Sequence, residues 1–171
     1  KKIDVYGSKK TIKELSAKII ELGGNPNLIN KDQTGLIKDL NKQFEQISVG
    51  SILKDKSKNL IKDQTINNIN IRFQKVTDLP FKDLRKLIDE GKKELKEGII
   101  VVYAINENKV GLAVGVTKEL VGKFDAVKLV KIGSDIIGGK GGGGRADFAQ
   151  AGGALVDKIE NSFENIKKII N

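Results

Sequence analysis

The densest glycine run of the chain lies at residues 138–144, where six of seven residues are glycine and Lys140 is the seventh. Each glycine loses more backbone freedom on folding than any other residue. Such a run is useful where φ must be positive, or where another backbone or a ligand must come close. Backbone N–H groups before a helix bind phosphate oxygens, and Lys140 and Arg145 add two cations. The run is therefore either a phosphate-binding site or a flexible loop.

Two common phosphate-binding motifs are excluded at this run. No Gly-Lys-Ser/Thr closes it, as a P-loop would require. No acidic residue follows a second strand about twenty residues on, as a dinucleotide-binding fingerprint would require. Arg145 nevertheless offers a planar fork of donors that suits a phosphate or a base edge.

The segment Gly138–Gln150 closely resembles the glycine-rich signature that closes the C-terminal domain of alanyl-tRNA synthetases. In that family a GGKGGG-type loop runs into R-P-D-x-A-Q. The same domain type, DHHA1, also ends some phosphoesterases of the DHH family, but those usually carry histidine where this chain has Arg145. Two departures are one extra glycine and Ala146 in place of a proline that would preset φ. The resemblance covers the C-terminal part well and the helical first part by layout.

Absent residue types exclude several kinds of chemistry. The chain has no cysteine and no histidine, so it cannot form Cys/His zinc sites, Ser-His-Asp triads or Cys-His nucleophiles. No run of eighteen apolar residues predicts a membrane span, and no signal peptide opens the chain. It also has no methionine, so residue 1 is not a translation start and we expect a fragment or a processed product.

The formal net charge of +9 is unevenly distributed. Residues 1–62 hold 13 Lys against 7 Asp/Glu (+6), and residues 63–171 hold 18 Lys/Arg against 15 Asp/Glu (+3). A basic surplus favours anionic partners, nucleic acid first. A composition bias towards Lys, Ile and Asn explains the same charge equally well, so charge alone does not decide the partner.

Helical spacing dominates residues 1–65, which we predict to be a helical dimerisation segment. Apolar residues repeat over Thr11–Leu22, and Gly23-Gly24 ends that helix. A second helix, entered at Asn25-Pro26, is predicted to reach about Asp63. Its apolar seam steps by three and four residues, as in a coiled coil, through Ile37, Leu40, Phe44 and Ile47. We expect an antiparallel hairpin that packs on a second copy or on the following domain.

Residues 66–171 read as a small α/β globular domain, which makes the whole chain α+β. The predicted order is β-α-β-β-α-glycine loop-α. The strands are expected at Ile69–Val76, Ile99–Tyr103 and Val110–Val116, and the helices at 78–98, 125–136 and 155–170. Gly111 and Gly115 mark bulges or close approach. The glycine loop is expected between the last two helices, with the N-terminus of the following helix facing a ligand.

Several side chains near the glycine run have two interpretations. Lys118 either adds to a phosphate-binding face or is an ordinary surface lysine. Gln150 hydrogen-bonds either a base or the glycine backbone. Asp147 pairs with Arg145 or caps a helix, and Phe148 is expected in the core. Because aromatic residues are few, contacts through Lys and Arg fit better than base stacking. The resemblance to alanyl-tRNA synthetases implies tRNA binding, and the residues expected to contact tRNA are Lys118, Lys140, Gly141, Gly142, Gly143, Gly144, Arg145 and Gln150.

The resemblance also implies a function. Members of that family bind tRNA-Ala at its elbow through this region, self-associate, and link aminoacylation with editing. We therefore expect a cytoplasmic, homodimeric, non-catalytic module with tRNA as its partner, no membrane contact and no small-molecule substrate. No cofactor is expected here, and ATP, Mg²⁺ and Zn²⁺ are expected only in missing domains.

Two alternatives belong to other classes. The chain could be the substrate-binding C-terminal domain of a DHH-family phosphoesterase acting on nucleotides or short oligonucleotides, which predicts a preference for dinucleotides over tRNA. It could instead be a purely structural oligomerisation domain, which predicts self-association without affinity for RNA.

Overall fold

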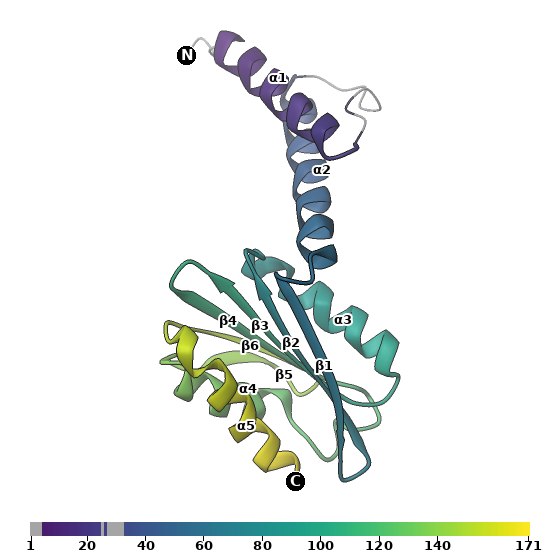
Figure 1. Ribbon diagram of the computed structural model, residues 1–171, viewed down its shortest axis with the longest axis vertical. Coiled ribbons are helices and arrows are strands. Elements are labelled where there is room, and N and C mark those ends of the chain that lie inside the picture. The colour runs from purple at the N-terminus through teal and green to yellow at the C-terminus, as the bar shows by residue number, and fades with distance from the viewer. Residues whose placement is uncertain (1–4, 25, 27–32) are drawn as a thin grey trace. The chain divides into compact units, whose positions relative to one another are not determined.

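A computed structural model describes residues 5–24, 26 and 33–171. The chain divides into two compact units, Lys1–Lys54 and Asp55–Asn171 (Figure 1). The first unit is helical and the second contains a six-stranded sheet. The predicted class, an N-terminal helical part followed by a small mixed α+β domain, is therefore confirmed.

The helical unit consists of α1 (Val5–Glu21) and α2 (Gln33–Lys54). The two helices pack through Ile19 and Leu40, both fully buried. The predicted seam of α2 faces this contact only in part, because Leu40 is buried while Ile37, Phe44 and Ile47 are half-buried. The start of the second helix was predicted at Asn25-Pro26, which lies partly outside the described residues, and α2 begins at Gln33.

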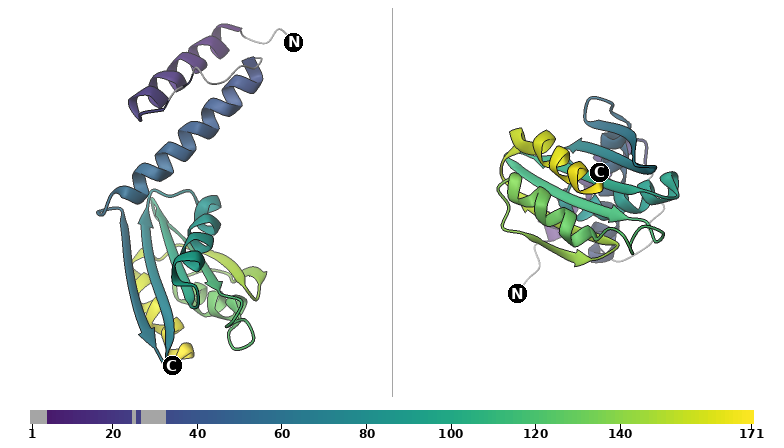
Figure 2. Two further views of the ribbon diagram at one scale, coloured as in Figure 1. Left: turned by 90° about the vertical axis from the view of Figure 1, so that its right-hand side faces the viewer. Right: turned by 90° about the horizontal axis from the view of Figure 1, so that it is seen from below.

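The two helices run in broadly the same direction, so the predicted antiparallel hairpin is wrong (Figure 2, left). Lys18 lies over the Phe44 ring, 5.8 Å from its centroid, and Gly24, which follows the end of α1, lies against Ile47, further along α2. Residues 22–32 separate the helices.

Helix α2 ends at Lys54, whereas the sequence predicted helix to about Asp63. Here the carboxylate of Asp55 accepts hydrogen bonds from the N–H of Ser57, at 2.9 Å, and from its hydroxyl, at 2.6 Å. This local competition ends the helix. Strand β1 (Asn59–Ile66) then begins the sheet. The globular unit therefore starts near Asp55 rather than at residue 66.

The sheet has the strand order β1-β2-β3-β4-β6-β5. Only β2 and β3 run parallel, and the other neighbours are antiparallel. The remaining strands are β2 (Ile69–Thr77), β3 (Ile99–Asn106), β4 (Lys109–Val116), β5 (Gly142–Arg145) and β6 (Phe148–Gly153). The helical elements are η2 (Phe81–Asp83), α3 (Leu84–Leu95), α4 (Ala126–Ile136), η3 (Val156–Lys158) and α5 (Ile159–Ile170).

Helices cover both faces of the sheet, with α3 on one face and α4 and α5 on the other (Figures 1 and 2). Strand β3 is buried over Ile99–Ala104, as its continuous β-branched run predicted. Glycine lets α3 come close to the sheet, because a Cβ on Gly115 would lie 2.2 Å from Ile88. Of the two interpretations of Gly111 and Gly115, close approach is confirmed.

A buried hydrogen-bond chain ties α4 and α5 to the sheet. The hydroxyls of Tyr103 and Ser162 lie 2.7 Å apart, and the Ser162 hydroxyl donates to the carbonyl of Gly133 at 2.8 Å. Burial raises the pKa of Tyr103 above its ordinary value, so this phenol stays neutral.

No helix among the described residues is long and apolar enough to cross a membrane.

The sequence predicted that the glycine run forms a loop between the last two helices, and this prediction is wrong. It enters β5, which pairs with β6, and η3 separates β6 from α5. The N-terminus of α5 is therefore not joined to the glycine run. The glycines instead lead into the edge of the sheet.

Candidate functional site

Strand β5 is an edge strand, and within the described residues it pairs with β6 alone. Gly143 lies opposite Gln150 and Arg145 opposite Phe148. Residues directly opposite each other in an antiparallel pair share one face of the sheet. These four residues therefore lie on one face. Since Gln150 lines a cavity with Phe81 of η2, this is the face that α3 partly covers.

Most glycines of the run are explained by their own surroundings. A Cβ on Gly142 would lie 2.4 Å from the carbonyl oxygen of Gln150, and a Cβ on Gly144 would lie 2.2 Å from that of Phe148. On Gly139 it would lie 2.1 Å from the Ser134 hydroxyl. Gly141 takes φ +90°, which side chains disfavour.

Gly143 is different, because nothing lies within 4 Å of where its Cβ would be and its φ is not positive. Neither packing nor backbone conformation requires glycine at this position. An exposed residue without a side chain, next to Arg145 and Gln150, leaves room for an external group to reach the backbone.

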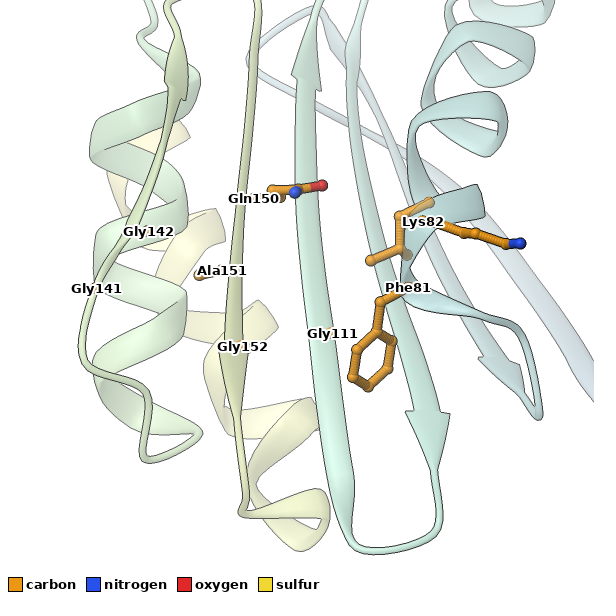
Figure 3. Close-up of a pocket in the computed structure, with 9 residues that line it drawn as sticks. Phe81, Lys82, Gly111, Gly141, Gly142, Gln150, Ala151 and Gly152 are labelled. Atoms are coloured by element: carbon orange, nitrogen blue, oxygen red, sulfur yellow. The ribbon is translucent and has the colours of Figure 1, made fainter. Parts of the chain in front are cut away.

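A cavity of about 340 Å³ lies on this face between η2 and the β5–β6 hairpin (Figure 3). Its lining residues are Phe81, Lys82, Leu84, Gly111, Gly141, Gly142, Gln150, Ala151 and Gly152. Gln150 is exposed and makes no side-chain hydrogen bond to any residue that the structure describes. Of its two predicted roles, bonding to the glycine backbone is therefore wrong, and its amide is free to meet a ligand.

Arg145 is exposed, and its Nε lies 3.3 Å from Oδ1 of Asp147. The carbonyl of Asp147 accepts from Lys92 Nζ at 2.7 Å and from the N–H of Val116 at 2.9 Å. Asp147 therefore pairs with Arg145, one of its two predicted roles, and joins the hairpin turn to α3 and β4. It does not cap a helix, because β6 follows it.

The sequence predicted that Phe148 lies in the core, but its side chain is only half-buried and lies beneath Arg85. The Arg85 guanidinium carbon lies 5.1 Å from the centre of the ring. Phe148 opposes Gly115 of β4 and Arg145 of β5, so its ring lies at the border between the covered and the open part of the sheet. There the cation of Arg85 shields the ring from solvent.

The structure gathers most, but not all, of the predicted site residues. Gly141, Gly142 and Gln150 line the cavity, Gly143 and Arg145 lie on the same sheet face, and Gly144 completes the strand. Lys140 is exposed just before β5. Lys118 lies at a separate hollow, beside α3. The sequence offered no signal for Phe81 and Lys82, because the crossover from β2 to β3 brings them to the glycines.

An ion pair that is partly buried lies away from this site, between β1 and β2. Arg72 of β2 donates two hydrogen bonds to the carboxylate of Asp63, at 2.8 and 2.7 Å, and another to Glu94. Those bonds from Arg72 lower the pKa of Asp63, against a smaller desolvation effect, and raise the pKa of Arg72.

Within the described residues, no group of three or more Asp or Glu side chains could hold a metal ion.

Comparison with known proteins gives consistent matches. Residues 68–171 match the DHHA1 domain family. An alanine–tRNA ligase of Parvibaculum lavamentivorans is 44% identical over 108 residues, covering 63% of this chain and 12% of that protein. The alanine–tRNA ligase of Rhodopseudomonas palustris is 34% identical over 159 residues, covering 92% of this chain and 18% of that protein.

The fold agrees with these matches. The C-Ala domain from Aquifex aeolicus alanyl-tRNA synthetase superposes with a TM-score of 0.60 and 27% identity, covering 63% of this chain and 96% of that domain. The chain spans only 12% and 18% of the two ligases that it matches. Taken together, the matches show that this chain belongs to the DHHA1 domain family and contains the C-Ala domain of alanyl-tRNA synthetases.

Proposed function

We propose that this chain is a tRNA-binding and dimerisation module of an alanyl-tRNA synthetase, which holds tRNA-Ala at its elbow in the cytoplasm. Aminoacylation and editing would then be carried by other domains. The homology supports this assignment, because the relatives named above are alanine–tRNA ligases. The open face of β5 and β6 offers the exposed donors that an RNA backbone needs.

Gly143 is the observation that carries the proposal. It lies between two glycines that the fold requires, yet the fold does not require Gly143 itself. Its neighbours on the same face, Arg145 and Gln150, supply a charged fork and an amide. A phosphate or ribose could therefore reach the main chain of β5 while Arg145 and Gln150 hold it from both sides.

Self-association is the second part of the proposal, and it rests on the helical unit. Leu40 is wholly buried between α1 and α2, so it is not available to a partner. Ile37, Phe44 and Ile47 are half-buried and could extend into an intermolecular contact. Exposed Ile20 and Leu22, at 61% and 38%, add apolar surface in the same unit. Sedimentation of Ile20→Glu against the unchanged chain tests this contact, and an unchanged mass would count against it.

Binding is tested by fluorescence anisotropy with three probes: intact tRNA-Ala, an acceptor minihelix that lacks the elbow, and a dinucleotide. We expect intact tRNA to bind more tightly than the minihelix. Gly143→Val should weaken tRNA binding at least tenfold, because the new side chain projects from the open face. Strand propensity favours valine at this position, so the fold should persist.

Gly122→Val is the matched control, since Gly122 also has nothing within 4 Å of its Cβ position and no positive φ. It lies in the turn after β4. Equal binding by both variants would remove Gly143 from the site. Selective binding of the dinucleotide would move the assignment to the DHH phosphoesterases, and self-association without RNA binding would leave an oligomerisation domain.

A further inference from the structure

A second hollow, of about 270 Å³, lies at the end of α3 and collects lysines from two segments distant in sequence. Three lysines come from the last part of α3 and its C-cap, and one follows β4. Its lining residues are Lys92, Lys93, Lys96, Val116, Thr117, Lys118, Glu119 and Asp147. Four cations thus face two carboxylates around one hollow, so the surface is electropositive there.

Lysines at the end of a helix often do no more than compensate its dipole. That explanation covers Lys92 and Lys93, but not Lys118, which belongs to another segment and lines the same hollow. Lys93, Lys96 and Lys118 form no ion pair with any residue in the described part of the chain. Elsewhere in the globular unit, Lys58, Lys75 and Lys86 each pair with a carboxylate.

Two hydrogen bonds, one to a side-chain hydroxyl and one between main-chain groups, hold the lysine-bearing segments together. The N–H of Gly98 donates to the Thr117 hydroxyl at 3.1 Å, and the N–H of Thr117 donates to the carbonyl of Gly98 at 3.1 Å. These two bonds fix the segment that carries Lys96 beside the segment that carries Lys118. The charges are therefore gathered by the fold before any ligand arrives, which lowers the cost of binding.

The hollow is joined to the glycine hairpin through Asp147. One carboxylate oxygen of Asp147 lies 3.3 Å from Arg145 Nε, and the other lies 3.7 Å from Lys92 Nζ. The cations of β5 and of the hollow thus meet across a single carboxylate. A polyanion that contacts Arg145 would reach the hollow past Asp147, whose negative charge Arg145 and Lys92 offset.

We propose that this hollow, defined by Lys93, Lys96 and Lys118, is a second phosphate-binding site for the backbone of the same RNA that contacts Arg145. The proposal rests on the proposed function. It extends the RNA footprint from the hairpin around its turn to the end of α3. The ligand is a phosphodiester of RNA, and free phosphate is the competing source of the same chemistry.

The test is the salt dependence of tRNA binding, measured with the complete 171-residue chain. The triple variant Lys93→Gln/Lys96→Gln/Lys118→Gln removes the three unpaired cations. Each lost phosphate contact lowers the slope of log K against log[salt] by roughly 0.7–0.9, so the slope should fall by roughly two to three. The control triple Lys62→Gln/Lys109→Gln/Lys168→Gln removes the same charge from exposed lysines on β1, β4 and α5.

A slope that falls equally in both triples would overturn the proposal, because net charge alone would then explain it. Titration with inorganic phosphate gives the other arm: phosphate binding lost in the hollow triple, beside an unchanged tRNA slope, would make this a free-phosphate site and also overturn it. Circular dichroism melting shows whether both triples remain folded.

Arg145→Gln separates this proposal from the proposed function. If Arg145→Gln weakens tRNA binding while the hollow triple behaves as its control, the module binds RNA and the second site is wrong. If the unchanged chain does not bind tRNA at all, both proposals are wrong.

Discussion

The two edges of the sheet are built in opposite ways. Strand β1 has eight residues with side chains of ordinary size, and its Asp63 is tied to Arg72 of the next strand. Strand β5 has four residues, three of them glycine, and only Arg145 carries a side chain. Charged side chains blunt an edge against pairing with other chains, and β1 follows that rule with Lys62 and Asp63.

This contrast indicates where a ligand can reach the backbone. At β1 the ion pair of Arg72 with Asp63 and Glu94 fixes the edge to β2 and to α3. At β5 the main chain is bare, and Arg145 lies beside it. Four predictions test the contrast.

Two neighbouring glycines of β5 should respond very differently to alanine. Gly144→Ala should destabilise the globular unit by roughly 2–3 kcal/mol, because its Cβ would overlap the carbonyl of Phe148. Gly143→Ala should stay within about 0.5 kcal/mol of the parent chain. Urea unfolding followed by circular dichroism measures both. Similar costs would mean that β5 is no more open at Gly143 than at Gly144.

Removing a positive charge should weaken RNA binding at the β5 edge of the sheet but not at the β1 edge. Arg145→Ala should weaken tRNA-Ala binding by roughly 1–3 kcal/mol, whereas Lys62→Ala on β1 should leave the affinity nearly unchanged. Anisotropy titrations at a single salt concentration compare the two variants. An equal loss for both would show that the RNA does not distinguish the edges.

The free energy of unfolding should depend on a charged side chain at the β1 edge, where RNA binding should not. Asp63→Ala removes the acceptor of two hydrogen bonds from Arg72, whose side chain is only 10% exposed. Because the Asp63 side chain is 46% exposed, solvent screening limits the expected loss to about 1 kcal/mol. Asp157→Ala, at an exposed pair with Lys158, is the control and should change the free energy of unfolding by less. A smaller loss for Asp63 than for Asp157 would contradict the role given to β1.

The smallest expected effect is a pH dependence at β1. Arg72 lowers the pKa of Asp63 in the folded chain. The ionised Asp63 carboxylate therefore stabilises the folded chain at pH values above the ordinary aspartate pKa of about 3.9. This stabilisation is lost as the pH falls through the lowered pKa of Asp63 in the folded chain. The difference in unfolding free energy between the parent chain and Asp63→Asn should shrink below about pH 4. A difference that is constant down to pH 2 would contradict the assigned pair.

The central strands and the helices beside them could be predicted because local pattern and tertiary environment agree there. The run Ile99–Tyr103 is apolar at every position, and a strand buried on both faces needs that. Strand β1 was missed because Leu53 and Leu60 lie seven residues apart, a spacing that fits the helix predicted to reach about Asp63. The sequence did offer a signal, because the pair Asn67-Asn68 is typical of a two-residue hairpin turn, which requires a strand before it. In the structure the two residues take φ +48° and +63°, as such a turn needs.

The glycine hairpin could not be predicted as strands. Glycine has low strand propensity, so β5 exists because β6 pairs with β4 and offers β5 its free side. The sequence did bring Arg145, Gln150 and the glycines into one candidate site. It could not show that Gly143 alone lacks an internal reason, since that depends on distances between segments.

The single-sided pairing of β5 has a consequence for local opening. A four-residue strand held by one neighbour can detach from β6 while the core stays closed, so its amide hydrogens should exchange with solvent long before those of β3. Any ligand that binds the bare main chain of β5 holds it closed and slows that exchange. Hydrogen exchange of the backbone amides of β5 therefore shows, residue by residue, whether a ligand is bound to the hairpin.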